Sequence, residues 1–215
     1  MDNRHLRILS RLGSAICIMV SAVGHTSASA ECTKSVGAQC QGAALRSAIW
    51  RNADLSGGNF RNANLEGANL EGARLKGADL RGANLKFARL VRTDLADANL
   101  EGTDLTGADL RHASLSRAQL GGASLARTTL EGTDLSHARL ANADLTRSVM
   151  VGADLPAADL RGAQLDGAFL NYANLKQANL SGTSIQRSRI IGARLAEAIW
   201  IDGKVCSATS VGSCD

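Results

Sequence analysis

The hydrophobic positions of this chain recur with a period of five residues. Between Leu45 and Trp200 the pattern contains 32 repeats without a slip of the frame. The central residue of each repeat is leucine, with six exceptions: Trp50, Phe60, Met150, Ile185, Ile190 and Trp200. The residue two places before it is always small: alanine, serine, threonine or, once, Gly58. The other three positions are largely polar or glycine, and Asp or Asn often precedes the leucine.

Neither an α-helix nor a continuous strand can use this period. Five residues rotate about 140° around a helix, so the leucines would scatter over every side. In a strand every fifth residue would switch faces, because side chains alternate with a period of two. Within one repeat, however, the small residue and the leucine are two apart and can point the same way. We therefore expect a locally extended chain that turns before the next small residue, where glycine is common and tolerates unusual backbone angles.

The stretch LEGANLEGARLKGADLRGANL at residues 65–85 shows the repeat, A(D/N)LxG, which resembles the pentapeptide-repeat family. The resemblance implies an all-β fold, a right-handed quadrilateral β-helix in which four repeats form one coil and the leucines and small residues point inward. On that geometry the chain forms about eight coils, each about 4.8 Å above the last, in a rod roughly 38 Å long. The four sides are named here by their first central residue: the Leu45, Trp50, Leu55 and Phe60 faces.

The few aromatic residues agree with such a tube. A narrow interior lined by leucine has room for an indole only near an open end, and Trp50, Phe60 and Trp200 fall in the first and last coils. They would help to cap a solenoid whose ends otherwise expose core and unpaired strand edges. Pro156 follows a central leucine and lacks a backbone donor, so we predict a local break in the hydrogen-bond ladder there.

The two ends of the chain lie outside the repeat. Residues 1–30 combine a basic start, a short apolar run from Leu12 to Val23 and the small residues Ala28-Ser29-Ala30, which is typical of a secretory signal peptide cleaved before Glu31. An uncleaved anchor is the alternative. We expect four parts: signal peptide 1–30, N-terminal cysteine loop 31–44, β-helix 45–202 and C-terminal cysteine loop 203–215.

Four cysteines follow the predicted cleavage site, in two pairs of spacing C-x7-C: Cys32 with Cys40, and Cys206 with Cys214. An even number of cysteines behind an export signal favours disulfides. Of the three possible connectivities we favour the two local pairs, because the repeat would hold the ends far apart. Free thiols and a metal site are the alternatives, although neither pair has the CxxC spacing or the nearby histidine typical of zinc ligands.

Candidate catalytic chemistry is sparse. His112 and His137 both fall at corners, and their separation places them on different sides of the coil, so we do not expect them to share a metal. No serine has a histidine and a carboxylate placed to activate it, and no phosphate loop or zinc motif is present. We therefore expect a protein that is not an enzyme and has no cofactor and no metal.

Charge argues against a second possibility, which the resemblance raises. Some family members imitate the shape and negative charge of DNA and bind type II topoisomerases such as gyrase. Here the Leu45 face carries five positive and four negative residues, and the Trp50 face five and three. The Leu55 face carries five and six, and the Phe60 face four and four. No face presents a phosphate-like field, and nucleic acid is an improbable partner because the net charge without residues 1–30 is only +2.

An apolar patch is a sharper indication. Five apolar residues occupy outward positions on the Trp50 face in three neighbouring coils: Val149, Val151, Phe169, Tyr172 and Ile191. Contiguous exposed apolar surface often marks an interface, unless a C-terminal segment folds back to cover it. The leading hypothesis is an exported, non-catalytic scaffold or protein-binding module, periplasmic or secreted, whose partner is another protein or a second copy. The alternative is a DNA mimic that binds a type II topoisomerase.

Overall fold

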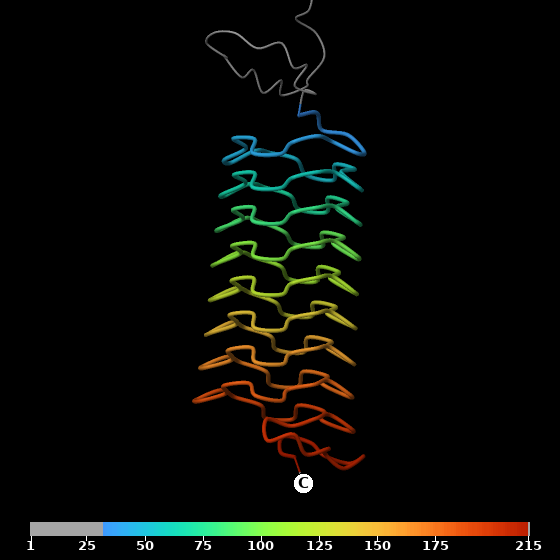
Figure 1. Cartoon of the computed structure of the whole chain (residues 1–215), viewed down its shortest axis with the longest axis vertical. Coiled ribbons are helices and arrows are strands. Elements are labelled where there is room, and N and C mark those ends of the chain that lie inside the picture. The colour runs from blue at the N-terminus through green and yellow to red at the C-terminus, as the bar shows by residue number, and fades with distance from the viewer. Residues whose placement is uncertain (1–31, 215) are drawn as a thin grey trace, which may run out of the picture.

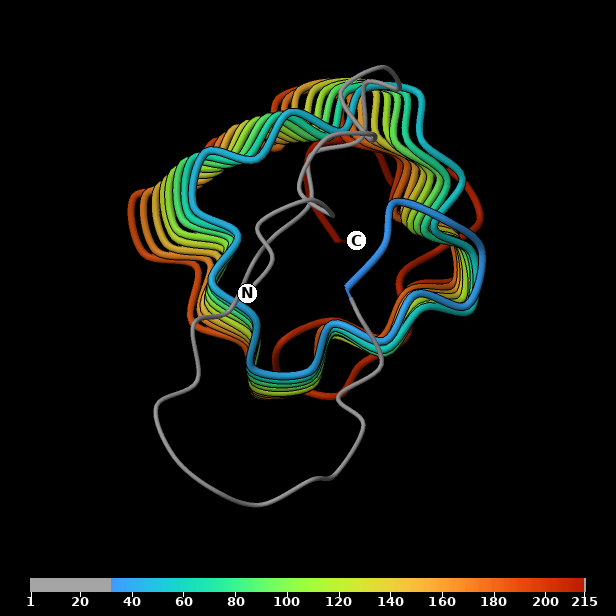
Figure 2. The ribbon, with the colours of Figure 1, turned by 90° about the horizontal axis from the view of Figure 1, so that it is seen from above.

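The chain winds into a single stack of coils. The computed structural model describes residues 32–214, so the predicted signal peptide lies outside the described residues. Parallel bridges join each strand residue to the one twenty positions later, from Gln39↔Asn59 to Asn179↔Ile199. Each coil therefore contains four five-residue repeats, and the coils rise one above another (Figure 1) around a shared four-sided outline (Figure 2). Over residues 32–214 there is no α-helix, and every β interaction is an isolated bridge.

Each repeat ends in a tight turn. In the repeat centred on Leu65, the Ala68 amide donates to the Leu65 carbonyl at 2.9 Å, and Gly67 between them has a φ of 65°. A positive φ at the third of four residues is the mark of a type II turn, and glycine adopts it without a steric penalty. The predicted role of glycine at the corner is confirmed. The lattice also imposes this conformation on residues with side chains, such as Phe87 and Arg147.

Three amides of each repeat donate to the neighbouring coils. Around Leu85, the Leu85 and Phe87 amides donate to Asp104 and Thr106 at 2.7 and 3.1 Å, and the Asn84 amide donates to Ala63 at 2.9 Å. A fourth amide, that of the small residue, closes the turn. The fifth, directly after the central residue, makes no backbone bond in the described coils. In many repeats the preceding Asp or Asn accepts from it, as Asn84 does from the Lys86 amide at 3.1 Å, which explains why Asp and Asn are common before the leucine.

Pro156 occupies this fifth position, and the predicted break in the ladder there is wrong. The flanking amides of Leu155 and Ala157 donate to the next coil at 2.7 and 2.8 Å, and the Pro156 carbonyl accepts from the His137 amide at 3.0 Å. Proline costs nothing here because the amide that it lacks belongs to no ladder bond, and its fixed φ suits the second position of a type II turn.

The interior is filled as the period predicted. From Leu55 to Leu180 the central residues are at most 1% exposed, and the small residues two places earlier are buried beside them. Burial of each leucine contributes about 1.5–3 kcal/mol to folding. Threonines among the small residues satisfy their hydroxyls inside the tube, as Thr103 does by donating to the Leu80 carbonyl at 2.8 Å.

Aromatic residues close the N-terminal end. Trp50 and Phe60 are 3% and 0% exposed, and their rings meet edge to face with centroids 6.2 Å apart. Cys40 takes a central position and its amide donates to Asn59 at 2.7 Å, so the lattice already includes the repeat before Leu45. The disulfide between Cys32 and Cys40 ties the first described residues to this repeat.

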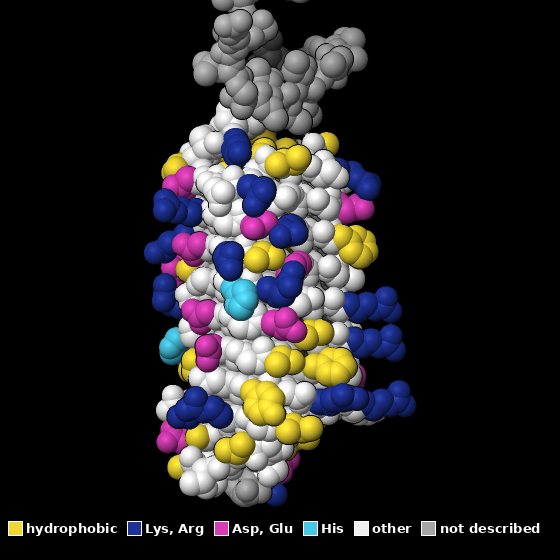
Figure 3. Space-filling model, turned by 180° about the vertical axis from the view of Figure 1, so that it is seen from behind, with side chains coloured by type: hydrophobic (Ala, Val, Ile, Leu, Met, Phe, Trp, Pro, Cys, Tyr) yellow, Lys and Arg dark blue, Asp and Glu magenta, His cyan; other side chains and the backbone are white. Residues whose placement is uncertain are grey.

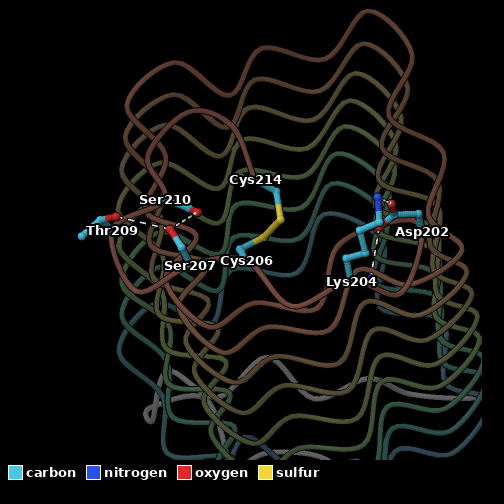
Figure 4. Close-up of a disulfide and its surroundings, with 7 residues drawn as sticks. All are labelled: Asp202, Lys204, Cys206, Ser207, Thr209, Ser210 and Cys214. Carbon is cyan, nitrogen blue, oxygen red and sulfur yellow. Dashed lines mark hydrogen bonds and ion pairs between the residues drawn. A yellow bond between two sulfur atoms is a disulfide. The ribbon is translucent and has the colours of Figure 1, made fainter.

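The C-terminal segment ends the ladder by reversing direction. It pairs antiparallel with the last coil, through Arg194↔Val211 and Ile199↔Val205. Figure 4 shows the Cys206–Cys214 disulfide within this segment. The structure thus has the two local cysteine pairs that the spacing favoured. An antiparallel cap covers part of the edge that a parallel coil would otherwise leave free to pair.

The Phe60 ring accounts for the only glycine at a small position. A Cβ at Gly58 would lie 2.5 Å from Cε2 of Phe60, closer than carbon atoms approach in folded proteins. We predict that Gly58→Ala destabilises the protein by about 1–3 kcal/mol through overpacking. The same substitution in a Phe60→Leu background should be neutral or stabilising, because the repeat then has the alanine and leucine of its neighbours. Urea unfolding of the four proteins measures this coupling, and equal costs in both backgrounds would contradict it.

Candidate functional site

The five residues of the predicted apolar patch lie on consecutive coils of one face. Val149 pairs with Phe169, and Phe169 pairs with Arg189, in one column of parallel bridges. The Tyr172 amide donates to the Ile191 carbonyl of the next coil at 2.9 Å. Figure 3 shows hydrophobic side chains gathered on this part of the surface.

The patch combines a flush centre with a raised margin. Val149, Val151 and Phe169 are half-buried, whereas Tyr172 and Ile191 are 67% and 66% exposed. Residues 203–214 do not cover these side chains, because they pair with Arg194 and Ile199 at the end of the stack. The alternative that the C-terminal segment folds back over the patch is therefore wrong.

Neighbouring residues hold the two rings in place. The Arg189 guanidinium lies 5.2 Å from the centroid of Phe169, a cation–π contact that occupies one face of the ring. The Tyr172 ring lies over Gly192, where a Cβ would come within 2.6 Å of Cδ1. Gly192 is thus a requirement of the patch as well as of its turn.

Two shallow grooves follow the corner that precedes the Trp50 face. The larger, of about 550 Å³, is lined by Thr106, Ala126, Arg127, Thr146, Arg147 and Asp166. The smaller, of about 230 Å³, is lined by Arg147, Asp166, Gly167, Gln186 and Arg187. Sequence reasoning missed these arginines because it summed charges over whole faces. The signal that would have found them is arginine at the left-handed turn position in coils 20 residues apart.

Many carboxylates elsewhere are paired with arginine. In three repeats an Asp before the central leucine pairs with the Arg after it: Asp79 with Arg81, Asp109 with Arg111 and Asp159 with Arg161, at 2.5, 2.7 and 2.7 Å. The hydrogen bond from arginine is the largest cause that lowers the pKa of each of these carboxyls. Between coils, Arg117 pairs with Asp97 at 2.7 Å and likewise lowers the pKa of that carboxyl. The acidic residues therefore lie beside positive charge.

The two histidines stand at separate corners. His112 and His137 have φ values of 58° and 57°, both are exposed, and they belong to the Trp50 and Leu55 faces. Among residues 32–214, no group of three or more His, Cys, Asp or Glu side chains is arranged to hold a metal ion. In the same part of the chain, no helix has the length and apolar character needed to cross a membrane.

Comparison with known proteins identifies the repeat. The family model for pentapeptide repeats matches in eight copies over residues 38–77, 58–95, 88–125, 123–162 and 158–196. The chain belongs to the pentapeptide-repeat family. Among curated proteins no match is found.

Several solved structures are similar to this pentapeptide-repeat protein. HetL of the cyanobacterium Nostoc sp. strain PCC 7120, which is involved in regulation of heterocyst differentiation, is 35% identical. The match covers 79% of this chain and 85% of HetL, with a TM-score of 0.40. AT2G44920, from the thylakoid lumen of Arabidopsis thaliana, is 25% identical over 64% of this chain and 84% of its own, with a TM-score of 0.38. QnrB1, a plasmid-mediated fluoroquinolone resistance protein, is 19% identical over 66% of this chain and 81% of its own, with a TM-score of 0.31.

The arginine-paired carboxylates predict how stability depends on pH. Because the folded-state pKa values of Asp79, Asp109 and Asp159 are lowered, their contribution is complete above the unfolded value of about 3.9 and is lost as pH falls through the folded values. We expect the melting temperature to be nearly constant from about pH 7 to 5 and to fall below about pH 4.

The double variant Asp109→Asn/Asp159→Asn should make that decline shallower, because asparagine keeps an acceptor for the next amide but cannot lose a charge. Asp144→Asn is the matched control. Within the described residues Asp144 accepts the Thr146 amide but has no arginine partner. Thermal melts between pH 2.5 and 7 measure the slopes, and the same slope in all three proteins would contradict the role of the pairs.

Proposed function

We propose that this protein is an exported, non-catalytic scaffold or protein-binding module of the bacterial envelope, periplasmic or secreted. The observation that carries the proposal is the apolar patch on the Trp50 face. Two of its five side chains are about two-thirds exposed on a surface that is otherwise polar and charged. In structural terms the proposal is a right-handed quadrilateral β-helix of about eight coils, which family membership supports. The parts are a signal peptide, 1–30, two cysteine loops, 31–44 and 203–215, and the β-helix, 45–202.

Export is supported by two independent features. The first 30 residues have the charge and apolar pattern of a signal peptide. Four cysteines form two disulfides, Cys32–Cys40 and Cys206–Cys214, and disulfides persist in oxidising compartments such as the periplasm. The similar protein from the thylakoid lumen also works outside a reducing cytosol, which agrees with this location.

A rigid tube suits recognition better than chemistry. The regular interior leaves only the outward positions free to vary, and the hydrogen-bond ladder holds them at fixed spacings. A partner therefore meets a preorganised surface and binding does not require the surface to become ordered. The partner is a protein, either another chain or a second copy of this one.

The DNA-mimic alternative takes second place. It requires a surface with a strong negative field, whereas each face here carries both signs and many of the carboxylates are paired with arginine. The likeness to QnrB1 is a likeness of fold. Inhibition of DNA supercoiling by gyrase in the presence of the purified protein would revive this alternative.

The patch itself can be tested by two lysine substitutions. We predict that Val151→Lys/Phe169→Lys abolishes association with a partner protein or a second copy, because burial of a lysine ammonium in an apolar contact is strongly unfavourable. The β-rich circular dichroism spectrum should be unchanged, since both side chains point outward. Sedimentation velocity and retention of proteins from envelope extracts are the measurements.

Ile49→Lys/Phe87→Lys is the matched control. Ile49 and Phe87 are 72% and 66% exposed and lie in the N-terminal half, outside the patch. The control should behave as the unmodified protein does. Loss of association in both variants would show a general effect of added charge, and no loss in the patch variant would rule out this interface.

A further inference from the structure

A column of arginines runs beside the apolar patch. Arg127, Arg147 and Arg187 occupy the left-handed turn position of the corner that leads into the Trp50 face, with φ values of 58°, 56° and 60°. Two residues after each of them the chain reaches the column that contains Val149, Phe169 and Arg189. Figure 3 shows Lys and Arg side chains projecting from the edge beside the hydrophobic side chains. The name "arginine column" is kept below for Arg127, Arg147 and Arg187.

These arginines differ from most others on the tube. Arg81, Arg111, Arg117 and Arg161 are each paired with an aspartate, but within residues 32–214 no member of the arginine column makes an ion pair. Asp166 lies in both grooves with them, yet its carboxylate accepts from the Ser184 hydroxyl at 2.6 Å and the Gln186 amide at 2.7 Å. The column therefore presents positive charge that the described surface does not neutralise.

The local balance of charge is positive along this corner and the adjoining face. From residue 126 onward, four arginines are present at the outward positions of the corner and the Trp50 face: Arg127, Arg147, Arg187 and Arg189. The acidic residues at the same positions are two, Glu131 and Asp166. An apolar centre beside uncompensated guanidinium groups is the composition found at protein interfaces, where aromatic residues and arginine carry much of the binding energy.

We infer that the apolar patch and the arginine column form one docking surface for a protein segment in which acidic side chains flank apolar ones. The inference rests on the proposed function and adds the chemistry of the partner. Guanidinium groups form strong, geometrically specific hydrogen bonds with carboxylates, so acidic residues of the partner would set its position along the corner. Its apolar residues would cover Phe169, Tyr172 and Ile191.

The shape of the patch favours a protein over a lipid surface. Insertion into a bilayer needs apolar side chains that project, whereas Val149, Val151 and Phe169 are half-buried. One face of the Phe169 ring is also occupied by the Arg189 guanidinium. A flat, partly buried apolar surface is instead the kind that a second protein surface can match in shape.

A selection from a random peptide library displayed on phage, with the purified full chain as bait, tests the chemistry of the partner. Enriched peptides should combine Asp or Glu with aromatic or branched aliphatic residues. By fluorescence anisotropy, their affinity should fall at least about tenfold for the triple variant Arg127→Glu/Arg147→Glu/Arg187→Glu and should weaken with added salt.

The matched control reverses three charges on the opposite side. Lys76→Glu/Lys176→Glu/Arg194→Glu lies on the Leu55 face and changes the net charge by the same amount, so peptide binding should be retained. Equal losses in both triple variants would reduce the effect to net charge and overturn the inference. Enrichment of peptides without acidic residues would overturn it as well.

Two further outcomes separate this inference from the proposed function. If Val151→Lys/Phe169→Lys abolishes peptide binding and the arginine variant does not, the acidic chemistry is wrong and the protein-binding patch stands. If neither variant has an effect, both are wrong. Binding to phosphatidylglycerol vesicles that depends on the patch and the column, without enrichment of acidic peptides, would assign the surface to a membrane instead.

Discussion

The twenty-residue register between coils is the constraint on which the rest of this structure depends. Backbone amides and carbonyls pair between a residue and its counterpart in the next coil, so any shift of one coil would break the bonds of its neighbours as well. The register also stacks leucine on leucine and small residue on small residue inside the tube, so polar pairing and apolar burial favour the same arrangement.

The same register organises the surface. Because outward positions recur every 20 residues, side chains distant in sequence form straight columns, such as Val149, Phe169 and Arg189. A few substitutions at equivalent positions are enough to create an apolar patch or a charged corner without any change in the core. The large side chains at turns make this visible, since the Phe87 and Tyr172 rings each lie over a glycine of the next coil. The fold thus separates what stabilises the protein from what another molecule can contact.

Much of this architecture could be predicted from the sequence because the period is strict. The inward leucines, the glycine corners and the aromatic residues near the ends all follow from the spacing of residue types. Pro156 was misjudged because a sequence pattern does not reveal which of five amides lies outside the ladder. The arginine column was missed because sums over a face combine three outward positions that point in different directions. The fit of Gly58 to the Phe60 ring depends on contacts inside one coil, which residue spacing does not specify.

Residue-resolved hydrogen exchange by NMR tests the central claim most directly. In the described coils four of every five amides donate to a backbone carbonyl, and the amide after the central residue does not. The account predicts strong protection at those four positions and fast exchange at the fifth, repeated with a five-residue period through the middle of the chain. Protection with a helical period, or slow exchange at the amide after each leucine, would contradict a tube built on this register.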